Sequence, residues 1–140
     1  MLESAQSFMR ELDAIEWGYR PPRELESGKV VITCGINGKV NKYDMTFIFD
    51  EDGKTMGVRV FQLVKVPIDK KLQVMELVNQ LNISYRWIKF LIDKEDNVDL
   101  QADSILRGEN TGKVGVELMV HMFKIIDEVY PKFMRTIWAD

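Results

Sequence analysis

The glycine-rich segment Gly108–Gly115 has the spacing that comes nearest to a chemical motif, and it reads Gly-Glu-Asn-Thr-Gly-Lys-Val-Gly. A phosphate-binding loop of the Walker type places four residues between its first glycine and a Gly-Lys pair, and a magnesium-binding hydroxyl after the lysine. Only three residues separate Gly108 from Gly112, and Val114 stands where the hydroxyl is needed. We therefore predict a loop that leads into a helix, capped by Asn110 or Thr111, rather than a phosphate site.

Two acidic segments, Asp50–Gly53 and Lys94–Asn97, offer carboxylates. A calcium loop needs oxygen ligands at regular alternate positions and a distal glutamate, and neither segment supplies them. We predict that both are solvated hairpin turns. A paired-carboxylate active site drawn from Asp44, Asp50 or Asp99 stays open, because nothing in the sequence selects one pair over another.

His121 and Cys34 are the only histidine and the only cysteine in the chain. This composition argues against a zinc site of the usual ligand types and does not permit an intrachain disulfide. His121 is predicted to face solvent on the last helix, with no nucleophile near it in sequence. Cys34 falls on the apolar face of a strand and is predicted to be a small core residue. We expect no catalytic residue, no metal and no cofactor.

The composition describes an ordinary globular chain. Its 140 residues favour a single domain over residues 1–140, and the net charge is −3. Lysine and arginine are scattered, whereas nucleic-acid binders carry a basic excess on one face, so we expect no nucleic-acid partner. The chain shows no signal-peptide pattern at its start and no apolar run long enough to span a membrane. These features predict a soluble cytoplasmic protein without a membrane partner.

The first half of the chain predicts a helix followed by three strands. Apolar residues three and four positions apart predict an amphipathic helix over Leu2–Ile15. The connector Trp17–Arg23 contains two consecutive prolines, which favour extended backbone. Alternating apolar and polar residues predict strands over about Lys29–Asn37, Val40–Asp50 and Thr55–Val66.

Two local signals refine these strands. Asn37-Gly38 predicts a two-residue hairpin turn, since both residues tolerate positive φ. The alternation slips at Phe61, which indicates a bulge or a strand covered on both faces.

The sequence of the second half predicts a helix, then a hairpin of two strands, and then a second helix. A helix opens at Pro67 and ends near Asn82, with a predicted buried stripe of Ile68, Leu72, Met75, Val78 and Leu81. Strands follow over Ser84–Asp93 and Val98–Leu106, and a long helix over about Lys113–Trp138.

Two of these elements carry more apolar residues than one core face needs. In the strand over Ser84–Asp93, Tyr85, Trp87 and Leu91 form a second apolar face. The last helix is apolar over about half its circumference, beyond the roughly 100° stripe that covers one sheet face. Either the first helix or a second subunit covers the excess, and we predict a homodimer.

Ordinary packing would explain most of the aromatic residues that remain, but Trp17 and Trp138 lie outside clean periodic segments and are the better candidates for another role. The alternative is a surface that contacts other proteins or peptides, because exposed aromatic patches serve that use. Base stacking on Tyr85 and Trp87 is a further alternative that the acidic composition disfavours. The predicted protein-binding residues are Trp17, Tyr19, Tyr85, Trp87, Leu91 and Trp138.

The segment Val78–Asp93 and the hairpin after it resemble the YbjN family of bacterial proteins. The shared pattern is an apolar helix ending near Asn82, an aromatic strand with Trp87 and Phe90, and a polar turn after Ile92-Asp93. A second strand and a helix led by a glycine-containing loop complete it. The element order matches over essentially the whole chain, and the sequence detail is confined to about Val78–Asp103.

The resemblance implies an α+β fold in the order α-β-β-β-α-β-β-α, with a five-stranded antiparallel sheet packed with three helices. It also implies a likeness to type III secretion chaperones, and a regulatory role in bacterial sensory transduction without established catalytic residues. A shared fold alone is weak support for a shared function. We predict a non-catalytic protein-binding module with a regulatory or chaperone-like role. A small-ligand or nucleic-acid sensor and an enzyme of unrecognised type remain as alternatives.

Overall fold

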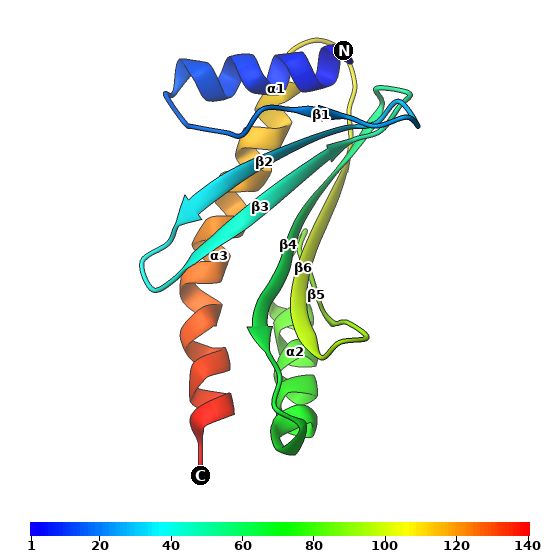
Figure 1. The fold of residues 1–140 in the computed structure, drawn as a ribbon. Helices are drawn as coiled ribbons and strands as arrows, with labels where there is room; N and C mark the ends of the chain where they lie inside the picture. The colour runs from blue at the N-terminus through cyan, green and yellow to red at the C-terminus, as the bar shows by residue number, and fades with distance from the viewer.

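The computed structural model describes residues 1–140 and shows three α-helices against one open antiparallel sheet (Figure 1). The sheet order is β1-β2-β3-β4-β6-β5. In chain order the elements are α1 (Glu3–Ala14), β1 (Arg23–Glu24), β2 (Val30–Asn37), β3 (Lys42–Phe49), β4 (Thr55–Lys65), a 3-10 turn η1 (Ile68–Lys70), α2 (Lys71–Ser84), β5 (Lys89–Ile92), β6 (Asn97–Ile105) and α3 (Gly112–Trp138).

The predicted α+β class is confirmed, but the sheet has six strands rather than five. The additional strand is β1, which pairs with β2 through Arg23↔Val31 and Glu24↔Val30. The proline-containing connector before it runs beside β2, and the Arg20 N–H donates to the Thr33 carbonyl oxygen (3.0 Å). Two residues are too few to show an alternating pattern, so the sequence carried no signal for this strand.

The connection between β2 and β3 is longer than the predicted two-residue turn. Asn37 pairs with Lys42, so residues 38–41 form the loop. The Asp127 carboxylate of α3 accepts the Lys39 N–H (2.9 Å) and ties this loop to the helix. A Cβ on Gly38 would lie 2.9 Å from that carboxylate, so the glycine serves close packing rather than positive φ.

The slip at Phe61 is a bulge in β4, as predicted. The β4–β6 register shifts between Val60 and Val64, and Gln62 has a φ of 56°. The Gln62 N–H donates to the carboxylate of Asp99 (2.8 Å), whose residue is 6% exposed. A buried side chain from β6 therefore replaces the ladder hydrogen bond that the bulge removes.

Asp99→Ala is expected to lower the free energy of unfolding by about 1–3 kcal/mol, because it leaves the Gln62 N–H without its acceptor. Asp99→Asn keeps an acceptor and is expected to preserve stability at neutral pH. Burial, and then the neighbouring Asp93 carboxylate, raise the pKa of Asp99 above 3.8.

This raised pKa predicts a pH dependence with a definite sign. Between the ordinary value of 3.8 and the raised value, the folded state holds more protons than the unfolded state. The contribution of Asp99 is therefore present at low pH and lost as pH rises through the raised pKa. Asp93 acts oppositely, since backbone N–H donors lower its pKa. Urea unfolding of the wild type and of Asp99→Asn across pH 3–7 checks this. As the pH falls, the free energy of unfolding of the wild type should rise relative to that of Asp99→Asn. If the two free energies changed with pH in parallel, the prediction would be contradicted.

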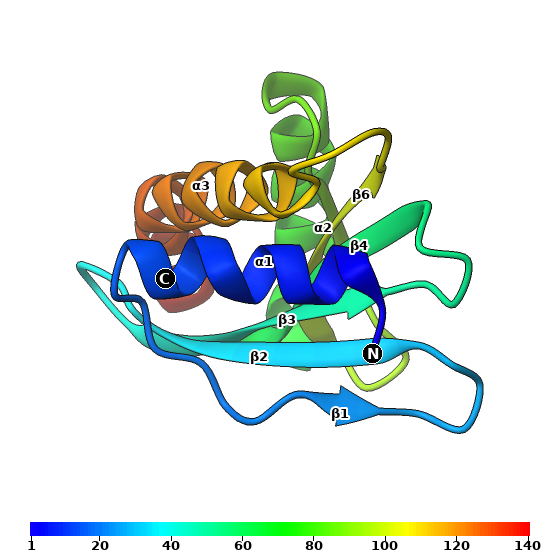
Figure 2. The same cartoon turned by 90° about the horizontal axis from the view of Figure 1, so that it is seen from above.

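α1 lies across the beginning of α3, on the same side of β2 and β3 (Figure 2). The Ser7 hydroxyl accepts the Gly112 N–H (2.9 Å), so α1 caps α3 in place of the predicted Asn110 or Thr111 side chain. Phe8 is fully buried, with ring centroids 4.5 Å from Phe47 and 5.5 Å from Phe49. The first helix thus covers part of the apolar half of α3, which was one of the two predicted alternatives.

α2 turns a different flank to the core from the predicted one. Ile68, Leu72 and Met75 were predicted to be buried, but they are 88%, 76% and 49% exposed. Val74 and Leu81 are the buried residues of this helix. Apolar side chains occupy more than half of its circumference, so their spacing did not decide which flank meets the core.

The free edge of β5 is closed by a side chain of α2. Asn82 Nδ2 donates to the Phe90 carbonyl oxygen (3.0 Å), and Asn82 Oδ1 accepts the Phe90 N–H (2.7 Å). The amide thus takes the hydrogen bonds that a neighbouring strand would make. β1, at the opposite edge of the sheet, is only two residues long.

Candidate functional site

Two of the predicted binding residues, Trp17 and Tyr19, lie in the connector after α1 and are half-buried. The Trp17 indole stacks on Phe123 of α3, with ring centroids 6.1 Å apart and planes at 15°. The Tyr19 hydroxyl donates to the Asp13 carboxylate (2.9 Å). Both side chains hold the connector against its neighbours.

Trp138, the last residue of α3, is 78% exposed. It lines an open groove between the C-terminal end of α3 and the turn η1, together with Pro67, Met134 and Ile137. Trp17, Tyr19 and Trp138 therefore differ in exposure and come from distant parts of the chain.

Tyr85 and Trp87 do not lie on a strand, contrary to the prediction. α2 continues through Ser84, and β5 begins only at Lys89 because the residues between them do not keep strand backbone. Burial, together with the hydrogen bond that its hydroxyl donates to Glu128 (2.7 Å), raises the pKa of Tyr85 to about 12. Leu91 is in β5 and is half-buried. The predicted second apolar strand face is therefore absent.

Trp87 combines strained backbone with high exposure. Its φ is 75°, although it is neither glycine nor a short polar residue, and the residue is 73% exposed. A bulky residue in the left-handed region is an outlier that costs about 1–3 kcal/mol. Such strain persists only where the surrounding structure imposes it.

The connector that carries Trp87 is fixed on both sides. His121 Nε2 lies 3.2 Å from the Arg86 carbonyl oxygen and donates to it. Ile88, immediately after the tryptophan, is buried. Together with the Tyr85–Glu128 hydrogen bond, these contacts hold the backbone while the indole faces outward.

Beside this indole is a hollow of about 470 Å³ between β6 and α3. Val114 and Leu118 are half-buried in it, whereas Glu117 and His121 are exposed. An apolar floor with a carboxylate and an imidazole at its rim suits a side chain of a polypeptide partner. The lining residues are Trp87, Ser104, Val114, Glu117, Leu118 and His121.

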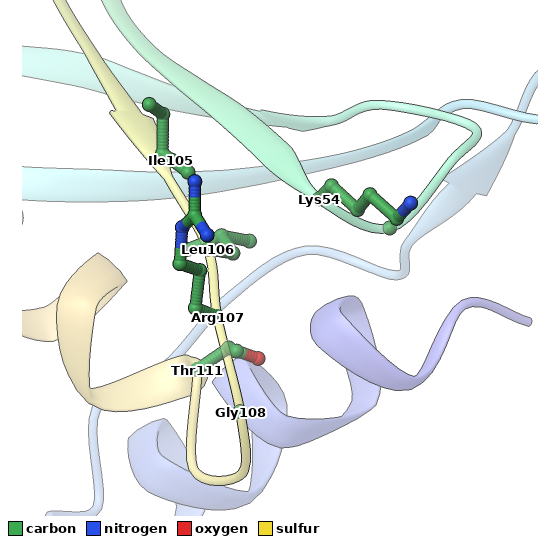
Figure 3. Close-up of a pocket in the computed structure, with 7 residues that line it drawn as sticks. Lys54, Ile105, Leu106, Arg107, Gly108 and Thr111 are labelled. Carbon is green, nitrogen blue, oxygen red and sulfur yellow. The ribbon is translucent and has the colours of Figure 1, made fainter.

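A second hollow, of about 570 Å³, lies where β6 passes into α3 (Figure 3). Lys54 and Arg107 line it, but Figure 3 shows the Lys54 side chain directed away from the Arg107 guanidinium. The first N–H groups of α3 already have partners: Ser7 Oγ for Gly112 (2.9 Å) and the Asn110 carbonyl for Lys113 (3.1 Å). The hollow therefore lacks the convergent donors that hold an anion at a helix start.

The glycines of this loop have a packing role. A Cβ on Gly112 would lie 2.3 Å from the Ser7 backbone, and one on Gly115 would lie 2.6 Å from the Phe8 ring. Gly112 and Gly115 therefore reflect close contact between α1 and α3, whereas Gly108 has a positive φ of 74°.

The acidic segments form hairpin turns, as predicted. Asp50 accepts the Thr55 hydroxyl (2.6 Å), and Asp93 Oδ1 accepts the N–H groups of Glu95 and Asn97 (2.9 Å each). No group of three or more His, Cys, Asp or Glu side chains is placed to share a metal ion.

The only cysteine and the only histidine lie where the sequence predicted them. Cys34 is a buried core residue, as predicted, and burial raises the pKa of its thiol to about 11. His121 is exposed, also as predicted. None of the helices combines the length and apolarity needed to cross a bilayer.

One exposed apolar surface was missed by sequence reasoning. We call it the outer flank of α2; it consists of Leu72, Met75 and Ile83 of the helix together with Ile68 of the preceding turn η1, and Ile83 is 77% exposed. The available signal was the presence of apolar residues on both sides of the helix, including Val74 and Leu77 next to the predicted stripe. A helix that is apolar beyond one stripe needs cover on a second side.

Comparison with protein families gives one match, and comparison with curated proteins and with solved structures gives none. The match covers residues 10–133 and is to the YbjN family, described as "Putative bacterial sensory transduction regulator". It spans α1 from Arg10 onward, all six strands, α2 and most of α3. The chain, with its strained Trp87 connector inside the matched range, therefore belongs to the YbjN family.

Proposed function

We propose that the protein is a non-catalytic regulator that acts by binding other proteins or peptides in the bacterial cytoplasm. The family description supports the regulatory part of this proposal. A chaperone-like mode of action, and a fold similar to that of type III secretion chaperones, belong to the same proposal. They are supported by the arrangement of three helices against an open antiparallel sheet.

The observation that carries the proposal is the exposed Trp87 indole on fixed, strained backbone beside the hollow of β6 and α3. Tryptophan is among the residues that contribute most to protein interfaces, and a fixed backbone lowers the entropy lost on binding. A partner would place an apolar side chain in the hollow, against Leu118 and the indole. Glu117 and His121 at the rim would meet its polar groups.

Trp87→Gly separates a binding role from a structural role. Glycine adopts φ 75° without strain, so the free energy of unfolding should stay within about 1 kcal/mol of wild type or rise. Binding should be lost, because the indole is gone. Chemical unfolding measures the first effect, and affinity capture from lysate of the native cells with quantitative mass spectrometry measures the second.

Trp138→Ala is the comparison variant, since that indole is similarly exposed but lines a different groove. A partner captured by wild type and by Trp138→Ala, but not by Trp87→Gly, supports the proposal once purified components reproduce the difference by calorimetry. Identical recovery by all three chains contradicts the role of Trp87. Recovery of nucleic acid in place of protein contradicts the proposed class of partner.

A further inference from the structure

The hollow beside Trp87 and between β6 and α3, which we call the Trp87 hollow, has an unpaired carboxylate at its rim. This carboxylate is that of Glu117, which is exposed and belongs to none of the ion pairs of the chain. Lys113 lies one turn earlier on α3, yet it makes no ion pair with Glu117. The carboxylate is therefore available to a cation from outside the chain.

The other two polar side chains at the rim also present acceptors. His121 Nε2 donates to the Arg86 carbonyl oxygen (3.2 Å), so Nδ1 of the neutral imidazole is an acceptor. The Ser104 hydroxyl donates to the Ile105 carbonyl oxygen (3.2 Å), so its lone pairs are what it can offer a ligand. The rim side chains thus provide a carboxylate, a ring nitrogen and a hydroxyl oxygen. This set of acceptors matches a ligand that only donates.

The rest of the hollow suits a cation on an apolar stem. Val114 and Leu118 are half-buried on α3 and form an apolar floor. Trp87 is 73% exposed, and the face of an indole attracts cations more strongly than that of any other aromatic side chain. Lysine and arginine lay their methylene stems along apolar surface while their charged ends reach polar groups. An anion would be repelled by the Glu117 carboxylate, and a purely apolar side chain would leave that carboxylate unpaired.

Arginine fits the positions of these acceptors better than lysine does. Glu117 and His121 are one helical turn apart on α3, whereas Ser104 reaches the hollow from β6. A guanidinium has five N–H donors in a rigid planar fork and stacks on aromatic rings, so it can donate to separated acceptors while it lies on the indole. The lysine ammonium is a compact, strongly hydrated point charge. Arg86, adjacent to Trp87 in sequence, does not line the hollow, so the chain does not fill it with its own guanidinium.

We propose that the Trp87 hollow binds an arginine side chain of a partner polypeptide. The guanidinium lies against the Trp87 indole and donates to Glu117 and to His121 Nδ1, and the methylene stem lies on Leu118. The net charge of −3 favours the approach of a basic segment. This inference rests on the proposed function and names the chemistry of its partner, since the apolar part of the bound side chain is the arginine stem.

A peptide titration followed by NMR tests the arginine directly. Three capped pentapeptides, Gly-Ala-X-Ala-Gly with arginine, citrulline or leucine as X, are added to the isotope-labelled protein. The Trp87 indole N–H resonance, identified by its absence from the spectrum of Trp87→Gly, should shift with the arginine peptide. Citrulline has nearly the shape of arginine without its charge, so its peptide should bind about tenfold more weakly. Equal affinity for the arginine and citrulline peptides, tighter binding of the leucine peptide, or no shift with the arginine peptide overturns the proposal.

Glu117→Gln tests the role of the carboxylate. It should weaken binding of the arginine peptide about two- to fivefold, the range for a solvent-exposed ion pair. Glu109→Gln is the matched control, because it removes the same charge from an exposed residue that does not line the hollow, and it should bind as the wild type does. Equal weakening by both variants would assign the effect to net charge and overturn the contact with Glu117.

Affinity capture with Trp87→Gly separates this inference from the proposed function. If Trp87→Gly loses the captured protein but the arginine peptide does not bind the wild type, the arginine assignment fails and the proposed function stands. If Trp87→Gly retains every captured protein, the proposed function fails, whatever the peptides do.

Discussion

Gly112→Ala is expected to lower the free energy of unfolding by about 3 kcal/mol or more. The added Cβ would lie 2.3 Å from the Ser7 carbonyl carbon and oxygen, and these are backbone atoms that cannot swing aside. Overpacking of this kind costs about 1–3 kcal/mol. Moving α1 away would also break the Ser7–Gly112 hydrogen bond, and an unsatisfied N–H adds about 1–3 kcal/mol. Denaturant unfolding followed by circular dichroism measures the change.

Gly18→Ala is the matched control for that measurement. No heavy atom lies within 4 Å of the Cβ that it would add, and Gly18 does not have positive φ. Its unfolding free energy should stay within about 0.5 kcal/mol of wild type. Equal effects of the two substitutions would show that the close approach of α1 to Gly112 does not exist in solution.

Phe8→Ala is expected to cost about 3–5 kcal/mol, the range for removing a fully buried phenylalanine. Its ring contacts Phe47, Phe49 and the backbone at Gly115, so truncation leaves a cavity between α1, the sheet and α3. Thermal and urea unfolding should both report the loss.

The same substitution at Phe61 provides the comparison. Phe61 is 55% exposed beside the β4 bulge, so Phe61→Ala should change stability by less than about 1 kcal/mol. If Phe8→Ala were no more costly than Phe61→Ala, the interior position of α1 would be contradicted.

The periodicity of apolar residues correctly predicted the helix and the strands that turn one apolar face to the core. The α1 stripe and the alternation in β2, β3 and β6 locate these elements to within a few residues, because the apolar residues of each recur on one face and that face is buried. The same reasoning failed for α2, where both flanks are apolar. It also failed for Ser84–Asp93, which was predicted to be one strand. In the structure Ser84 ends α2, residues 85–88 form a connector, and the strand β5 begins only at Lys89.

The candidate site was predictable only in part. Trp87 was selected as part of a second apolar face on a predicted strand, and the structure contains no such face. The features that distinguish it, a φ of 75° and a carbonyl–His121 hydrogen bond at the preceding residue, depend on long-range contacts that no local pattern carries. The pairing of Ser7 with Gly112 escaped notice for the same reason, since 105 residues separate them.

That separation has a consequence for how the protein is made. The apolar face of α1 is synthesised more than a hundred residues before its cover at Gly112 and Gly115. Closing a loop of that length is slow compared with forming local hairpins. Phe8 can pack on Phe47 and Phe49 sooner, but its side that meets α3 stays accessible to chaperones and to self-association until α3 is synthesised. The core is complete only when α1 and α3 meet.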